Sequence, residues 1–95
     1  MLEETKNNYA KYRHYLKSYI NRDGVDKLIS FLDNQTDMAV APASSKYHGS
    51  YEGGLVQHSL NVFMRLHKLL TNEYGENCPY SKETIAIVAL LHDIS

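Results

Sequence analysis

The sequence changes from an irregular region to a helical one at Gly53-Gly54-Leu55-Val56-Gln57-His58-Ser59. Two adjacent glycines let a backbone turn sharply and approach a neighbouring segment closely. From about Leu55 to Tyr74, apolar residues then recur at helical spacing, which predicts a helix. The residues expected on its packed face are Leu55, Ser59, Val62, Leu66 and Leu69. His58 precedes Val62 by one turn and is therefore expected to point toward the buried side.

A later helix is expected to lead into the last five residues, Leu91-His92-Asp93-Ile94-Ser95. Ser81 is a good N-cap for it, and Glu83 in the first turn suits the positive end of the helix dipole. The residues predicted to share its apolar face are Ile85, Val88, Ala89 and His92, at i, i+3, i+4 and i+7.

Two further helices are predicted upstream, from about Leu2 to Ile20 and from about Val25 to Asn34. The first has a stripe rich in tyrosine, which suggests buried rings with hydroxyl groups left in water. The second has Asp23 just upstream as a candidate cap. The two stripes are Tyr9, Tyr12, Leu16 and Tyr19, and Val25, Leu28, Ile29 and Leu32.

A long connection without helical period is expected from Gln35 to Gly54. Irregular segments of this length inside a small domain are usually functional or disordered. We favour a functional loop, because polar and aromatic side chains gather just before the predicted helix: Tyr47, His48, Tyr51 and Glu52. Glu52 can alternatively cap the start of that helix.

Length and composition indicate one small all-α domain of 95 residues. Ten basic and eleven acidic side chains give a net charge of −1, which argues against long duplex DNA as a partner. A single cysteine excludes an internal disulfide framework, and the sequence has neither a signal-peptide pattern nor an apolar run long enough for a membrane span. We expect a cytoplasmic protein.

The chemistry of the chain is expected to centre on two histidines and one carboxylate. His58 and His92 come from two predicted helices, and Asp93 follows directly. Imidazole nitrogen and carboxylate oxygen suit Mn, Fe, Zn or Ni and, less well, Mg. Such an ion acidifies a bound water and polarises a phosphoryl oxygen. The competing interpretation is that each inward histidine is only a hydrogen-bonded core residue.

The segment Tyr47-His48-Gly49-Ser50-Tyr51-Glu52-Gly53-Gly54-Leu55-Val56-Gln57-His58-Ser59-Leu60-Asn61-Val62, followed by Ala89-Leu90-Leu91-His92-Asp93-Ile94, resembles the HD superfamily of metal-dependent phosphohydrolases. It is most similar to small bacterial and phage HD proteins and to the HD half of 3'-to-5' exoribonucleases. The resemblance implies a helical HD-domain-like bundle, with residues 1–45 as a helical lead-in and 46–95 as the first part of the HD core.

The resemblance also implies roles for individual residues. His58, His92 and Asp93 would be the metal ligands and the catalytic centre, and His48 would line the substrate side or the side of a second metal ion. Tyr51 and Glu52, in the loop just before the helix, are also expected to contact the substrate. The family's final ligand aspartate and a phosphate-binding lysine have no counterpart before Ser95. We therefore expect a bundle that is incomplete at its C-terminal side, and a homo-oligomer that covers the exposed apolar faces.

The leading hypothesis is a phosphohydrolase that acts on a nucleotide or on a short RNA or DNA end. The alternative is a non-catalytic HD-derived fragment that binds a nucleotide or a protein partner. A third possibility is RNA binding through the first helix, where basic side chains alternate with tyrosines. The competing interpretation of that helix is an ordinary solvated outer face.

Overall fold

The computed structural model describes residues 1–43 and 51–93. Within these ranges the chain forms four α-helices, one short 3-10 helix and no strand. The elements are α1 (Glu3–Tyr19), α2 (Val25–Gln35), α3 (Gly54–Tyr74), η1 (Gly75–Asn77) and α4 (Lys82–Leu91). The all-α fold predicted from the sequence is confirmed. Helices α1, α2 and α3 begin and end within one residue of their predicted bounds, and α4 begins directly after its predicted cap, Ser81.

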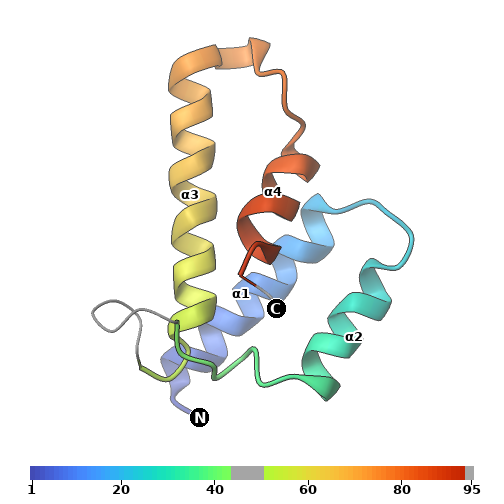
Figure 1. Cartoon of the computed structure of the whole chain (residues 1–95), viewed down its shortest axis with the longest axis vertical. Helices are drawn as coiled ribbons and strands as arrows, with labels where there is room; N and C mark the ends of the chain where they lie inside the picture. The colour runs from blue at the N-terminus through green and yellow to red at the C-terminus, as the bar shows by residue number, and fades with distance from the viewer. Residues whose placement is uncertain (44–50, 94–95) are drawn as a thin grey trace.

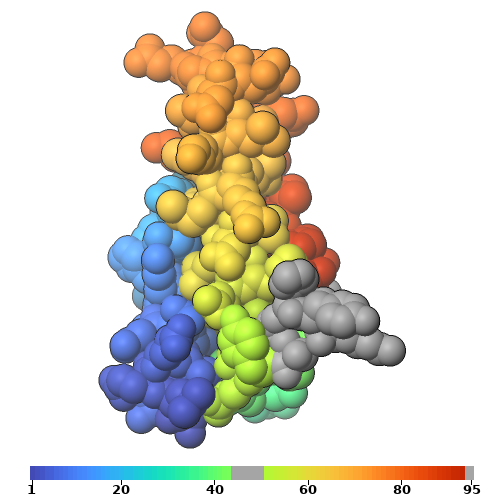
Figure 2. All heavy atoms as spheres, turned by 90° about the vertical axis from the view of Figure 1, so that its left-hand side faces the viewer, coloured from blue at the N-terminus to red at the C-terminus, as the bar shows by residue number. Residues whose placement is uncertain are grey.

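Helices α1, α3 and α4 each contact the other two, whereas α2 packs against α1 (Figure 1). The C-terminal part of α3 and η1, orange in the figure, extend beyond the other helices (Figure 2). None of the helices in residues 1–43 and 51–93 is both long enough and apolar enough to cross a lipid bilayer. Because α1, α3 and α4 pack against one another, these three helices fix the positions of His58 and His92.

The glycine step before α3 turns sharply and closely approaches another segment, as predicted, and that segment is α1. Gly53 has a φ of +78°, a conformation that L side chains rarely adopt. A Cβ atom at this position would lie 3.0 Å from Cγ2 of Thr5, which is almost fully buried. The amides of Gly53 and Leu55 donate to the carbonyls of Val40 and Ala41, each at 3.0 Å. The start of α3 is thus fixed by both α1 and the segment that follows α2.

The predicted cap of α4 is confirmed, and the predicted cap of α2 is wrong. The Ser81 hydroxyl accepts a hydrogen bond from the Thr84 amide at 3.0 Å. Helix α2 instead begins after Gly24, whose φ is +95°, and Asp23 makes no capping hydrogen bond. A glycine in the left-handed conformation redirects the chain into α2 without a side-chain acceptor.

Glu83 in the first turn of α4 also binds the link between α1 and α2. Its carboxylate accepts from the Asn21 amide at 2.5 Å and from Nε of Arg22 at 3.1 Å. These hydrogen bonds, the one from the Asn21 amide above all, hold the pKa of Glu83 below its ordinary value. The start of α4 is therefore tied to the chain just after α1.

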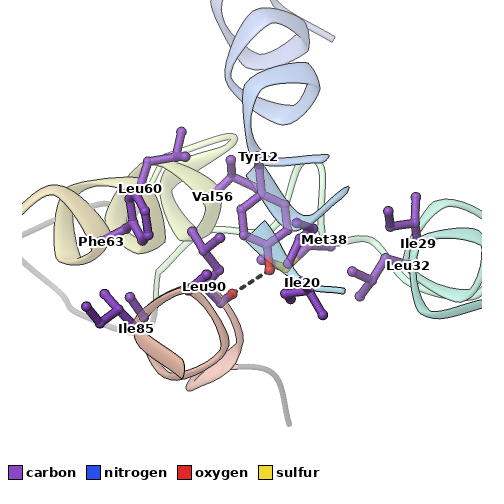
Figure 3. Packing of buried hydrophobic residues seen from close by; sticks show 13 residues of the cluster. Tyr12, Ile20, Ile29, Leu32, Met38, Val56, Leu60, Phe63, Ile85 and Leu90 are labelled. Carbon is purple, nitrogen blue, oxygen red and sulfur yellow. Dashed lines mark hydrogen bonds between the residues drawn. The ribbon is translucent and has the colours of Figure 1, made fainter. Parts of the chain in front are cut away.

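The hydrophobic core lies where α1, α3 and α4 meet and continues toward α2 (Figure 3). Tyr12 and Leu16 of α1 are fully buried, as are the small residues Ala86 and Ala89 of α4. Small side chains on α4 let the neighbouring helices approach closely. The other core residues are Ile20, Ile29, Leu32, Met38, Val56, Leu60, Phe63, Ile85 and Leu90.

The predicted packed faces of α3 and α4 are partly wrong. In α3 the buried side chains are Val56, Ser59, Leu60 and Phe63, whereas Leu69 is 63% exposed. In α4, Val88 is 53% exposed, and Ala86 and Leu90 are buried in its place. Each of these helices packs against two neighbouring helices, so its buried surface faces the space between them. The spacing of apolar residues in the sequence does not predict which side of the helix this is.

Candidate metal centre

Three side chains converge where the N-terminal end of α3 meets the C-terminal end of α4. His58 lies in the second turn of α3, and His92 and Asp93 directly follow α4. One nitrogen from each ring and one oxygen of the carboxylate all lie within 4.8 Å of one another. The antiparallel neighbours α3 and α4 thus bring together residues that are distant in the sequence.

The Asp93 carboxylate lies between the two imidazole rings. Its Oδ2 atom is 3.1 Å from Nε2 of His58 and 2.9 Å from Nε2 of His92. The ring centroids are 5.8 Å apart, at an angle of 53°. All three groups therefore present a potential ligand atom to one small volume.

A backbone hydrogen bond assigns the tautomer of His92. Its Nδ1 atom is 2.9 Å from the Ala89 carbonyl oxygen, which can only accept, so Nδ1 carries the proton. In the neutral ring, Nε2 then has a free lone pair directed at the Asp93 oxygen. Two acceptors at 2.9 Å attract only when a proton or a cation lies between them. A carbonyl on the other ring nitrogen is also the usual arrangement of a metal-binding histidine.

The three side chains lie at the surface, contrary to the expectation that both His58 and His92 point toward the buried sides of their helices. The exposed fractions of the side chains are 46% for His58, 35% for His92 and 40% for Asp93. His58 is displaced outward because the packed face of α3 is centred on Val56, Leu60 and Phe63. The donor atoms can therefore be reached by a solute.

The donor set fits a divalent cation that prefers nitrogen and oxygen ligands. Two imidazole nitrogens and one carboxylate oxygen suit Mn, Fe, Ni or Zn, and three protein ligands leave coordination positions open for water or substrate. Within residues 1–43 and 51–93, this is the one cluster of three such groups close enough to share an ion. The arrangement can hold a cation at the protein surface, where a substrate can reach it.

Three residues, His48, Tyr51 and Glu52, were expected to line the substrate side. His48 lies outside the described residues. The Tyr51 side chain is 54% exposed, and its hydroxyl donates to Oε1 of Gln57, which adjoins His58 in α3. This hydrogen bond holds the Tyr51 side chain against the first turn of α3, next to His58.

Glu52 caps α1 and not α3, contrary to the alternative considered for it. Its Oε2 atom accepts from the Leu2 amide at 3.1 Å and from the Thr5 hydroxyl at 3.2 Å. A carboxylate at this end of a helix satisfies free amide groups and opposes the positive end of the dipole. The contact with α1 accounts for the orientation of Glu52 seen in the structure.

Two residues that support the centre were not recognised as such from the sequence. Thr5 contacts Gly53 at the start of α3, and Tyr12 donates its hydroxyl to the Leu90 carbonyl at 2.5 Å, just before His92. The hydroxyl of Tyr12 is buried, so the expectation of wet tyrosine hydroxyls is wrong at this position. The central place of Tyr12 in the apolar stripe signalled burial, but nothing local identified its partner.

Comparison with known proteins gives one named relative. Over 82 residues the chain is 35% identical to a protein of Methanocaldococcus jannaschii named dihydroneopterin 2',3'-cyclic phosphate phosphodiesterase. The similarity covers 72% of this chain and 32% of that protein, so the chain spans about a third of the length of its relative. No protein-family model matches the chain, and no solved structure does.

Proposed function

We propose that this chain provides the metal centre of a divalent-metal-dependent phosphohydrolase of the HD type. The observation that carries the proposal is the convergence of His58, His92 and Asp93, with all ligand atoms within 4.8 Å of one another. The named relative supports phosphoester hydrolysis as the reaction class, because it is itself named as a phosphodiesterase. Residues 46–95 would form the metal-binding part of the HD core.

His58, His92 and Asp93 would hold the ion, which would be Mn, Fe, Ni, Zn or Mg. A divalent ion in such a site makes water more acidic and stabilises negative charge on a phosphoryl oxygen. The protein supplies the orientation: Ala89 fixes the His92 tautomer, and Asp93 lies between the rings. No separate nucleophilic side chain is required for this class of reaction.

The proposed substrate is a small phosphorylated molecule such as a nucleotide, or a short RNA or DNA end. A net charge of −1 gives no overall field that would attract a long polyanion. His48, Tyr51 and Glu52 are proposed to line the substrate side, with the Glu52 carboxylate held in place there by its hydrogen bonds from Leu2 and Thr5. For Tyr51, the support is its hydrogen bond to Gln57, next to His58.

The alternative is a non-catalytic module that binds a nucleotide or a protein partner through the same centre. It is favoured by the number of ligands, because only three metal-binding groups cluster in the described part of the chain. Loss of a ligand weakens the hold on the ion and the control of its geometry. The two proposals share a metal site and differ in turnover.

Metal binding and hydrolysis together test the proposal. Titration with Mn²⁺ by calorimetry should show one site in the native chain that is lost in His58→Ala. His67→Ala is the matched control, because His67 lies exposed on the same helix and outside the cluster. The native chain should hydrolyse bis(p-nitrophenyl) phosphate in Mn²⁺, whereas His58→Ala should not.

Each result has a defined meaning. Metal binding that depends on His58 without hydrolysis would favour the non-catalytic module. Equal binding by the native chain and His58→Ala, or no binding by either, would overturn the metal centre itself.

Self-association is a further part of the proposal. Met64, Leu69 and Val88 are each more than half exposed on α3 and α4. Large exposed apolar side chains favour association with another surface. We propose that copies of the chain associate through exposed apolar side chains of α3 and α4, and a monomer at high concentration by light scattering would contradict it.

A further inference from the structure

Tyr12 of α1 is fully buried and reaches the end of α4 (Figure 3). Its hydroxyl donates to the carbonyl of Leu90 at 2.5 Å. The ring is surrounded by core side chains and lies against Tyr9, with a centroid distance of 6.3 Å. Burial raises the pKa of Tyr12 above its ordinary value, so the hydroxyl remains a donor.

The accepting carbonyl belongs to the last turn of α4, which ends at Leu91. Carbonyls of a last helical turn lack partners within their own helix and need others. Two successive carbonyls here have side-chain partners: Ala89 accepts from Nδ1 of His92, and Leu90 accepts from Tyr12. One contact orients the His92 ring, and the other holds the turn from which that ring projects.

Helix α1 also contacts the start of the other ligand-bearing helix. Thr5 lies two turns before Tyr12 on the same side of α1 and is buried against Gly53, where α3 begins. A single rigid helix therefore contacts α3 just before His58 and α4 just before His92. Its length between Thr5 and Tyr12 sets the distance between these two ends.

We infer that Tyr12 is a positioning residue for the metal centre, which it serves by holding the last turn of α4 so that His92 and Asp93 face His58. The inference rests on the proposed function and deepens it. The Tyr12 hydroxyl donates to the Leu90 carbonyl and to none of the three ligand side chains, so its effect on them passes through that carbonyl. The chain thus uses its N-terminal helix to define a site formed by the other two helices.

The test compares Tyr12→Phe with two control variants. Tyr19→Phe removes a hydroxyl from the same helix that makes no hydrogen bond to the described residues. Ile29→Val shortens a buried side chain in α2, away from α4, and controls for a general loss of stability. Circular dichroism with thermal melting would establish the folded fraction of each protein.

The first readout is Mn²⁺ affinity by calorimetry. Tyr12→Phe should weaken binding about ten-fold, as for other groups that support a metal ligand, whereas both controls should stay within about two-fold of the native chain. Affinity equal to the controls would overturn the inference. A variant that does not fold would also overturn it, because Tyr12 would then be required for the fold as a whole and not specifically for the positions of His92 and Asp93.

The second readout needs no metal. Nitrogen chemical shifts of the His92 ring report which ring nitrogen carries the proton. The native chain should show a proton on Nδ1, where Ala89 accepts it, whereas Tyr12→Phe should show partial loss of the Nδ1 proton, with both controls resembling the native chain. If the native chain bound no metal, the proposed function would fail, while this measurement would still decide whether Tyr12 orders the end of α4.

Discussion

The Asp93 carboxylate lies 3.1 Å from Nε2 of His58, although His58 belongs to α3 and Asp93 follows α4. The same oxygen lies 2.9 Å from Nε2 of His92. A carboxylate shared by two rings is thus the link between α3 and the end of α4. Its removal is the most direct probe of the centre.

Asp93→Asn should weaken Mn²⁺ binding by at least ~100-fold, because direct ligands matter more than the groups behind them. Asparagine keeps the shape of the side chain but lacks the negative charge. The metal-free protein should change in stability by no more than about 0.5 kcal/mol, since Asp93 is 40% exposed. Calorimetry and urea unfolding measure the two effects. Asp23→Asn, an exposed change outside the cluster, should leave both unchanged.

Gly53→Ala should destabilise the fold by roughly 2–3 kcal/mol, through backbone strain together with a clash. The new Cβ would lie 3.0 Å from Cγ2 of Thr5. Gly24→Ala is the matched control, because Gly24 also has a positive φ but has no atom within 4 Å of the added carbon. That variant should lose only about 1 kcal/mol. Equal losses in urea unfolding would show that the Thr5 contact contributes nothing.

Stability should fall in alkaline solution as the pH rises above 10. Burial raises the pKa of Tyr9 and Tyr12 in the folded chain above the ordinary value of 10.0. The unfolded chain therefore loses these protons first, and the contribution of the neutral hydroxyls, complete below pH 10, decreases above it. Tyr12→Phe should show a smaller decrease between pH 9 and pH 11 by urea unfolding, and Tyr19→Phe the same decrease as the native chain.

Glu83→Gln should destabilise the chain at neutral pH and have less effect in acid. Hydrogen bonds from Asn21 and Arg22 lower the pKa of Glu83 below its ordinary value of 4.5. A lowered pKa contributes stability that is present above 4.5 and is lost as the pH falls through the folded value. Urea unfolding at pH 7 and pH 3 should therefore show the two proteins converging in acid. A constant difference would mean that the carboxylate charge is not involved.

The helices were predictable because their signals are local. Ser81 as the cap of α4 and the sharp turn at Gly53 each depend on the residues of one short segment. The identity of the convergent residues was also predictable, because two histidines and an aspartate are chemically suited to one cation. Their partly exposed position was not, since it depends on how α3 is rotated about its axis.

The sequence alone determined where the helices run and which side chains have the chemistry of metal ligands, since spacing, capping and side-chain type are properties of short stretches. Only the tertiary structure decided that Val56 and Leu60 face the core, that Glu52 caps α1, and that Tyr12 holds the Leu90 carbonyl. These contacts join residues far apart in the chain. They depend on how the helices pack, and the sequence around one residue does not predict which distant residue it will contact.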